Sequence, residues 1–419
     1  MTSTQDLAGS APAGAGGPAG PPPAAAPKET SNLLGLMRDN VRASGIYLAF
    51  VAIVALFTWR TDGVLLSPDN LTNIVLQYSY ILVLAIGMVM VIIAGHIDLS
   101  VGSVAALTGA VSAVLVIREG MPWWVGIVAA LAVGLLVGAW HGFWVAYVGI
   151  PAFIVTLAGM LLFRGATLRV LDNVSLSPFP APYREVANGF LNGWLGGYGY
   201  DAFTLLVFAL AVAGYVVSQV RARGARRAYA QQVESVPLFV AKLVLVAAVV
   251  MAFAWQIATS RGLPIVLIVL AVLILVYAAV TKSTIFGRQI YAIGGNLSAA
   301  QLSGVNTRRI NFWVFVNMGF LSAVAGIIYS SRSGAAQPAA GNMFELDAIA
   351  AAFIGGAAVT GGVGTVVGAI VGGLIMAVMS NGMQLLGVEQ STQSIIRGLV
   401  LLLAVAFAVY AKRRSSGTR

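Results

Sequence analysis

Long apolar stretches recur along this chain and limit the folds open to it. Crossing the roughly 30 Å of hydrocarbon in a bilayer takes about 20 mainly apolar helical residues. About twelve stretches approach that length, near residues 44–60, 72–94, 99–117, 123–148, 151–171, 201–220, 238–258, 263–281, 312–331, 347–360, 363–386 and 394–411. Only 9% of the residues are charged, against roughly a quarter in soluble domains. We therefore predict an all-α, polytopic transmembrane bundle with about 10–12 spans and exclude a water-soluble fold.

The stretches at 99–117 and 347–360 are the weakest of the twelve, so the number of spans stays open. If all twelve cross the bilayer, both ends of the chain lie on one side. If these two stretches are instead re-entrant, ten spans remain and the two ends still share a side.

Basic residues indicate which side that is, because cytoplasmic loops carry an excess of lysine and arginine. Twelve spans place four basic clusters on one side: Lys28, Arg38 and Arg42; Arg221, Arg223, Arg226 and Arg227; Lys282, Arg288, Arg308 and Arg309; and Lys412, Arg413, Arg414 and Arg419. We predict a multi-pass protein of a bacterial inner membrane, with cytoplasmic N- and C-termini and an external loop at 172–200.

Composition divides the chain into three parts. Residues 1–43 form an Ala/Pro/Gly-rich cytoplasmic tail and lead-in, whose first 30 residues lack the large apolar side chains needed for ordering. Residues 44–411 form the membrane domain, and 412–419 a basic cytoplasmic tail. We expect no cleaved signal peptide, since no basic and apolar segment precedes the small residues at 11–13.

Short repeated patterns suggest an internal pseudo-repeat with broken helices. The sequence VGSV at 101–104 is echoed by VGTV at 363–366, and each follows a glycine-interrupted apolar stretch. Broken helices in duplicated halves are a common way to line a pathway in transporters. Glycines also recur every fourth residue, which places each set on one helix face and predicts close helix packing; the sets are Gly134, Gly138 and Gly142, and Gly364, Gly368 and Gly372.

Two charged residues are candidates for a pathway or gate. Asp98 lies between two apolar stretches, where a carboxylate is costly unless it is paired or hydrated. Either Asp98 or Ser100 caps the helix that starts near Leu99, or this segment takes part in gating. Arg164 interrupts the stretch at 151–171, whereas Arg169 is expected to snorkel toward the external interface.

Residues for covalent chemistry or cofactor binding are missing. The chain has no cysteine, and its two histidines, His96 and His141, lack carboxylate companions at metal-ligand spacing. The G-x-x-x-x-G-K-[ST] phosphate loop is also absent. We therefore expect a transport subunit and not an enzyme, with no metal and no cofactor bound by this chain, and we expect no nucleic-acid partner.

Three other classes of membrane protein fit this sequence less well. An ion-coupled secondary transporter normally buries coupling carboxylates in its helices, whereas the acidic residues here lie mainly near the ends of the stretches. An intramembrane enzyme would need a clustered nucleophile and base or metal ligands, and a channel would not need the loop motif described next.

Several motifs in the same order resemble a known family. Residues 95–103, GHIDLSVGS, are similar to the G-G-x-D-L-S-V-G-S signature of sugar-importing ATP-binding-cassette permeases of the ribose and xylose type, with His96 in place of the usual second glycine. Residues 150–157, 286–305, 345–351 and 361–365 also match this family. The basic and apolar stretch at about 221–281 is similar to the longer, xylose-type permeases.

The resemblance implies a permease for D-xylose or a related pentose that pairs with itself. Its expected partners are a cytoplasmic ATPase subunit, which holds ATP and Mg, an external sugar-binding protein, and the lipid bilayer. The loop at 282–311 resembles the family's cytoplasmic coupling loop, and its ATPase-coupling candidates are Gly294, Gly295, Asn296, Ala299, Ala300, Ser303 and Gly304. Its short helix should stop at Gly304.

A sugar presents many hydroxyl groups, so a pathway for it needs dispersed hydrogen-bonding groups and aromatic faces. Polar and aromatic side chains within the apolar stretches are the natural choices, although each is also suited to packing. The candidates for the translocation pathway or its gate are Asp98, Ser100, Gln77, Tyr78, Tyr80, Phe153, Thr156, Arg164 and Asn317.

Overall fold

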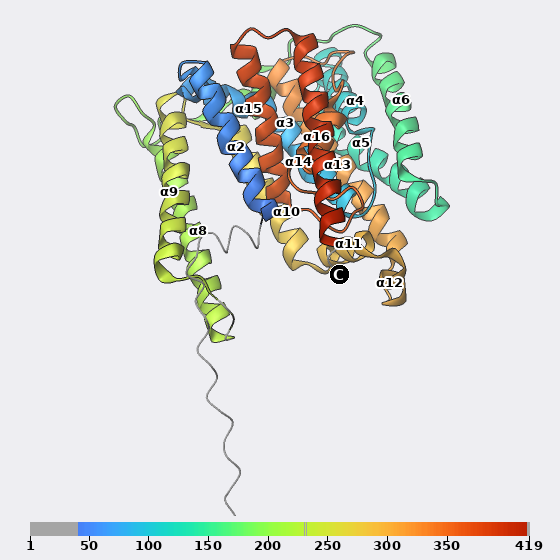
Figure 1. The fold of residues 1–419 in the computed structure, drawn as a ribbon. Helices are drawn as coiled ribbons and strands as arrows, with labels where there is room; N and C mark the ends of the chain where they lie inside the picture. The colour runs from blue at the N-terminus through green and yellow to red at the C-terminus, as the bar shows by residue number, and fades with distance from the viewer. Residues whose placement is uncertain (1–40, 230, 232, 417–419) are drawn as a thin grey trace, which may run out of the picture.

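The computed structural model describes residues 41–416 except 230 and 232, with side chains from 45 to 406. Residues 1–40 of the predicted tail and lead-in at 1–43, and residues 417–419 of the predicted tail at 412–419, lie outside this range. The helices are α2 (Val41–Arg60), α3 (Pro68–Ile93), α4 (Val101–Ala113), α5 (Trp123–Phe143), α6 (Ala152–Val170), α7 (Ala181–Asn188), α8 (Ala202–Ala228), α9 (Val236–Thr259), α10 (Ile265–Ser283), α11 (Ile285–Gly295), α12 (Leu297–Leu302), α13 (Thr307–Ser333), α14 (Phe344–Ile354), α15 (Val366–Leu385) and α16 (Gln390–Ser416) (Figure 1).

Short elements complete the chain. Single π-helical turns extend α4 and α5, at Val114–Arg118 and Trp144–Val148, and a 3₁₀ turn spans Val64–Leu66. Strands β1 (Phe190–Leu191) and β2 (Leu263–Pro264) pair antiparallel. The fold is therefore all-α, as the sequence predicts.

The chain makes twelve passes through the bundle. Within the described residues, nine helices are long and apolar enough to cross a membrane. Helices α2 and α16, whose apolar parts are shorter, make two more passes. The twelfth pass is made by residues 334–343, which form a series of turns, followed by α14, a helix of 11 residues.

Contacts fix the direction of these passes. Along α5, Gly134 lies against Gly319 of α13 and Gly142 lies against Phe312, so the two helices are antiparallel. Helix α4 is parallel to α13, because Ala105 lies against Gly326 and Gly109 lies against Ser330. The start of α2, the end of α16, α11 and α12 consequently share one end of the bundle, here called the α12 end (Figure 1). The opposite end, where α7 lies, is called the α7 end.

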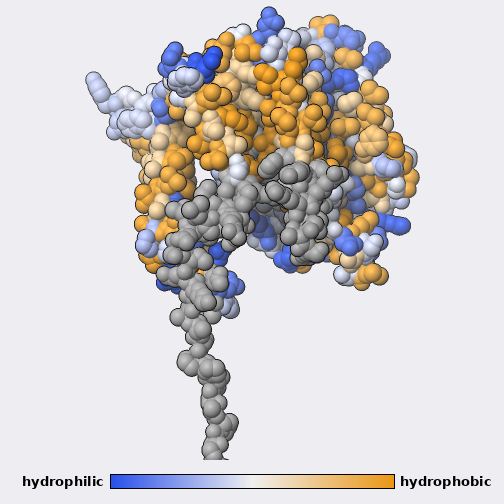
Figure 2. Space-filling model, in the orientation of Figure 1, coloured by the Kyte–Doolittle hydropathy of each residue, from blue (hydrophilic) through white to orange (hydrophobic). Residues whose placement is uncertain are grey.

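Helix α3 forms the centre of the bundle. Within the most apolar 18-residue segment of α3, 83% is buried inside the protein, whereas only 6% is buried in the corresponding segments of α8 and α9. Helices α8 and α9 stand at one side of the bundle and pack mainly against each other (Figure 1). Figure 2 shows hydrophobic residues over the visible helices and hydrophilic residues gathered toward the two ends. This pattern is that of a polytopic membrane protein.

The two weak stretches are broken passes. Helix α3 ends at Ile93, two residues before Gly95, which has a φ of +87°, and residues 94–100 rise as an irregular, non-helical segment to the start of α4. Residues 334–343 descend in the same way to α14. The two passes run in opposite directions and meet where Gly341 contacts Gly102. The predicted broken helices are therefore present, because each of these passes joins an irregular segment to a helix.

Both predicted sets of glycines pack closely, with one correction. A Cβ at Gly138 would overlap the backbone of α13, and one at Gly372 would overlap the Ala351 carbonyl of α14. Gly364, in contrast, lies before the first residue of α15 and has a φ of +154°. The prediction that it shares a helix face with Gly368 was wrong, because a backbone with that φ does not continue a helix.

Candidate functional site

The first part of the candidate site is the interior junction of the two broken passes. Helices α4 and α14 both begin there, with no side-chain hydrogen bond to cap either start. The first N–H groups of a helix have no partner within the helix and carry partial positive charge. The sequence thus places two such helix ends inside the protein, where hydrogen-bond acceptors are attracted to them.

Asp98 and Ser100 lie at this junction and are both buried. The Asp98 carboxylate accepts hydrogen bonds from the Ser100 backbone N–H at 2.8 Å and from its hydroxyl at 2.6 Å. Ser100, and not Asp98, occupies the N-cap position of α4, which begins at Val101, two residues after Leu99. Ser100 therefore has the predicted N-cap position but does not cap the helix. Its hydroxyl donates to Asp98, and the first amides of α4 receive no side-chain hydrogen bond.

A carboxylate from α14 completes the junction. Glu345 lies against Gly102 in the first turn of α4, and its Oε2 is buried with no hydrogen-bond partner among the described residues. Arg164 and Asp98 lie near it. Sequence reasoning treated Glu345 only as part of a motif. An acidic residue at the start of an apolar stretch is the signal that could have identified it.

Arg164 joins α6 to the second broken pass. Its guanidinium Nη1 donates a hydrogen bond to the Ala340 carbonyl, next to Gly341. Asp98, Ser100 and Arg164, which sequence analysis selected separately, therefore surround one junction. Ser103 is also buried there on α4, and its hydroxyl has no hydrogen-bond partner within the described part of the chain. The junction thus offers several unused hydrogen-bonding groups.

An aromatic cluster between α3, α13 and α14 forms the second part of the site. The ring of Tyr80 lies 4.5 Å from that of Phe344 and 5.2 Å from that of Tyr329, centroid to centroid. On the next turn of α14, Asp347 forms an ion pair of 3.8 Å with Arg397 of α16. Aromatic faces beside charged and polar groups are the chemistry that binds sugars.

Two other predicted pathway residues line the same helix as Tyr80. The Tyr78 hydroxyl is buried and has no hydrogen-bond partner in the described residues. Gln77 donates a hydrogen bond of 3.4 Å from its amide to that of Gln384 on α15. Both residues precede Tyr80 on α3, so they lie nearer than Tyr80 to the α7 end.

The remaining predicted pathway residues lie elsewhere. The Thr156 hydroxyl donates a hydrogen bond of 3.3 Å to the Ile97 carbonyl and so holds α6 against the irregular segment before α4. Phe153 is 54% exposed on the outer face of α6. Asn317, on α13, accepts a hydrogen bond from the Tyr277 hydroxyl of α10.

The coupling candidates form two short helices at the α12 end. The Asn296 carboxamide accepts a hydrogen bond of 2.9 Å from the Ala299 N–H and so caps α12. Helix α12 ends at Leu302 and is followed by Gly304, whose φ is +80°; the predicted stop at this glycine is confirmed. Ala300 is buried, whereas Ala299 and Ser303 are exposed. Leu302 is 91% exposed at the tip.

A glycine junction joins α11 to the core. Gly294 lies directly against the Ile93 carbonyl and the Gly362 N–H, and Gly295 lies against Gly362. The Gly362 N–H donates to the Ile93 carbonyl at 2.9 Å, and the Tyr291 hydroxyl donates to the Gly364 carbonyl at 2.7 Å. Three motifs that are far apart in sequence therefore meet at the α12 end.

The two histidines flank one aromatic ring. His96 and His141 lie 5.7 and 6.5 Å from Phe315, centroid to centroid. Among the described residues, no group of three His, Cys, Asp or Glu side chains is arranged to hold a metal ion.

Comparisons with known proteins identify the family of this chain. Residues 70–405 match the family model described as branched-chain amino acid transport system / permease component. The chain is 42% identical over 381 residues to the xylose transport system permease protein XylH of Escherichia coli K12, covering 91% of this chain and 95% of that protein. It is 40% identical over 366 residues to XylH of Haemophilus influenzae, covering 87% and 96%.

The ribose import permease protein RbsC of Escherichia coli K12 is 35% identical over 358 residues, covering 85% of this chain and 91% of that protein. No solved structure matches the chain. The matched residues include both broken passes, α11, α12 and the glycine junction. The chain therefore belongs to the branched-chain amino acid transport system permease component family, together with the xylose- and ribose-type permeases of ATP-binding-cassette importers.

Proposed function

We propose that this chain is the membrane-spanning permease subunit of an ATP-driven importer for D-xylose or a related pentose. The chain forms the translocation pathway, and a separate cytoplasmic ATPase hydrolyses ATP with Mg. An external sugar-binding protein delivers the sugar, and two copies of the permease pair in the inner membrane. The identity of 40–42% to two xylose permeases, over nearly their full lengths, carries the choice of sugar.

Coupling to the ATPase is supported by α12 and by the glycine junction. An apolar side chain that is 91% exposed, such as Leu302, gains free energy when a partner surface covers it. Helix α11 then transmits the displacement of α12 to Gly362 and Ile93, because Gly294 leaves no space at that contact. Close-packed contacts of this kind transmit displacement because they cannot be compressed.

The orientation is supported by charge. The basic cluster at the end of α8 and the cluster around α11 both lie at the α12 end (Figure 1). Since cytoplasmic loops carry the excess of Lys and Arg, we assign the α12 end to the cytoplasm. The N- and C-termini are then cytoplasmic, and α7 is external.

Sugar passage is supported by the interior junction and the aromatic cluster. Tyr80, Tyr329 and Phe344 supply apolar ring faces. Glu345 and Ser103 supply hydrogen-bonding groups that have no partner within the described residues. A pentose hydroxyl can use such groups without first breaking a hydrogen bond inside the protein.

Reconstitution tests this proposal. The permease is purified with its ATPase and binding protein, placed in proteoliposomes, and supplied with labelled xylose or ribose. ATP-dependent uptake of xylose that requires the binding protein supports the proposal, and a preference for ribose changes only the sugar. Uptake by the permease alone, driven by a proton or sodium gradient, would instead establish a secondary transporter.

A further inference from the structure

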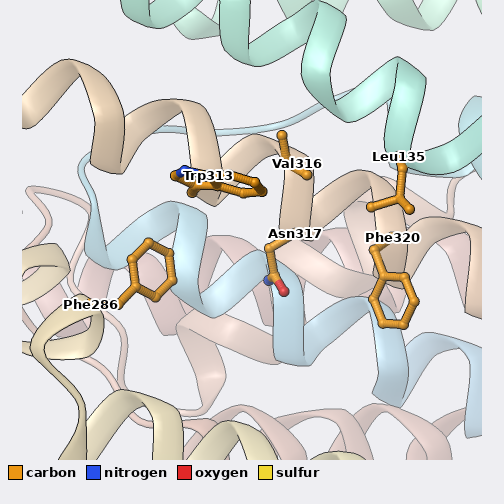
Figure 3. A pocket seen from close by; sticks show the side chains of 6 residues that line it. All are labelled: Leu135, Phe286, Trp313, Val316, Asn317 and Phe320. Atoms are coloured by element: carbon orange, nitrogen blue, oxygen red, sulfur yellow. The ribbon is translucent and has the colours of Figure 1, made fainter.

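A groove on the surface of the bundle is distinct from the candidate pathway. It has a volume of about 420 Å³ and is lined by Leu135, Phe286, Trp313, Val316, Asn317 and Phe320 (Figure 3). Trp313 and Phe286 lie toward one end and Leu135 and Phe320 toward the other, with Asn317 between them. The lining comes from α5, α11 and α13. Such a volume lies within the range of small-molecule sites, roughly 300–1,000 Å³.

The chemistry of the groove does not suit a sugar. Its only polar lining residue is Asn317, whose carboxamide oxygen accepts from the Tyr277 hydroxyl and whose nitrogen lies 3.8 Å from the sulfur of Met90. The amide is therefore already engaged at both atoms. The remaining lining is apolar, so the groove is complementary to a hydrocarbon chain.

A positive charge lies at the end of the groove nearest the α12 end. Arg309, Trp313, Val316 and Phe320 follow one another at spacings of four, three and four residues, so they share one face of α13. The Arg309 side chain is exposed, and no ion pair involves it within the described part of the chain. The groove thus continues on that helix face to a guanidinium group.

Two more basic residues lie near this end of the groove, and no acidic residue is close to them in the sequence. Lys282 and Arg288, both exposed, flank Phe286 in sequence where α10 gives way to α11. No acidic residue occurs in the sequence between Glu234 and Glu345. The opening of the groove is therefore basic, and an anion placed there would gain attraction without local repulsion.

Dimensions match one leaflet of a bilayer. From Arg309 to Phe320 is 11 residues, which is about 16 Å along a helix and close to half of the roughly 30 Å hydrocarbon thickness. A headgroup at Arg309 would therefore place the chain end near the middle of the membrane, beside Leu135 and Phe320.

We propose that this groove binds an anionic phospholipid. One acyl chain lies over Trp313, Val316 and Phe320, and the phosphate is held by Arg309 with Lys282 or Arg288. Basic sites between transmembrane helices that face the cytoplasm recognise anionic headgroups in this way. The proposal does not depend on which sugar the protein carries.

Native mass spectrometry of the full-length permease tests the site. Phosphatidylglycerol and phosphatidylcholine of the same chain length are titrated into the delipidated protein. One retained phosphatidylglycerol, in preference to phosphatidylcholine, is expected. Arg309→Gln should weaken its binding about fivefold, since one basic residue near a headgroup contributes about that factor.

Arg308→Gln is the matched control, because it removes an equal charge from the adjacent position on another face of α13. It should change binding by less than twofold. Val316→Trp, which fills the groove, should abolish the retained lipid while size-exclusion profiles stay unchanged. Equal loss in the Arg308 and Arg309 variants, equal retention of phosphatidylcholine, or loss of a permease dimer in the Val316 variant without loss of lipid would each overturn the proposal.

Discussion

Replacing Gly294 with alanine tests the glycine junction directly. A Cβ at this position would overlap the Ile93 carbonyl oxygen and lie 2.5 Å from the Gly362 nitrogen. To relieve that overlap, the backbone at Ile93 and at Gly362 must move away from α11, which disrupts the 2.9 Å hydrogen bond from the Gly362 N–H to the Ile93 carbonyl. Overpacking of this kind costs about 1–3 kcal/mol, and the lost hydrogen bond about 1 kcal/mol more.

The adjacent glycine provides the control. A Cβ at Gly295 would have no heavy atom within 4 Å, so Gly295→Ala removes a glycine from the same helix end without an overlap. We expect Gly294→Ala to lose about 2–4 kcal/mol of stability and Gly295→Ala to stay within about 0.5 kcal/mol of the parent.

Thermal denaturation of the purified permease in detergent, followed by the loss of its monodisperse peak, measures the difference. Because membrane proteins commonly denature irreversibly, the half-life at one temperature is compared along with the apparent Tm. ATPase stimulation in the reconstituted complex is measured on both variants. Equal stability and equal stimulation for the two alanine variants would refute the assignment of a tight contact to Gly294.

Three further predictions concern other parts of the protein. Asn381→Ala should cost about 1–3 kcal/mol because it leaves the buried Asn70 amide without its reciprocal partner on α15, and denaturation that matches the parent would contradict this. Burial raises the pKa of Asp201, but hydrogen bonds from Thr204 and Gly193 outweigh this effect and hold the pKa below its ordinary value. The stability that these hydrogen bonds contribute is full above about pH 4 and is lost as the pH falls further. Asp201→Asn should therefore make the stability of the protein depend less on pH in this acid range. Leu302→Asp should leave the apparent Tm nearly unchanged, since Leu302 is exposed, while abolishing ATP-dependent uptake in proteoliposomes; normal uptake would remove α12 from the coupling surface.

Hydropathy predicts most of the fold because each ordinary pass is one continuous apolar helix. It leaves the two broken passes undecided, because the irregular segments at 94–100 and 334–343 carry part of each pass outside a helix. The basic clusters predict that both ends of the chain share a side, but which helices pack together follows only from contacts such as that of Gly109 with Ser330. These contacts join residues more than 200 positions apart, and local patterns in one sequence do not encode them.

The candidate site was predicted in part. Asp98, Ser100 and Arg164 were selected because charge and capping residues are unusual inside apolar stretches, and the structure brings them to one junction. Glu345 was missed as a member of that junction, because its position follows from the meeting of Gly102 with Gly341. Phe153 was selected from a motif, although its exposed position on α6 depends on packing that the motif does not specify.

The arrangement of the two broken passes explains how one displacement at the α12 end, where we propose that the ATPase docks, can reach the interior of the permease. Ile93 is followed directly by the irregular segment that carries Asp98. Gly362 lies in the loop between α14, which carries Glu345, and α15. Gly294 contacts both Ile93 and Gly362.

A shift of α11 therefore acts on two connections to the junction, the one from Ile93 to Asp98 and the one from Gly362 through α14 to Glu345. If the two connections move by different amounts, ATP binding changes the separation of the helix starts of α4 and α14, and so the affinity of the groups between them for a sugar. By linkage, a sugar held there must then change the affinity of the ATPase for ATP by the same factor.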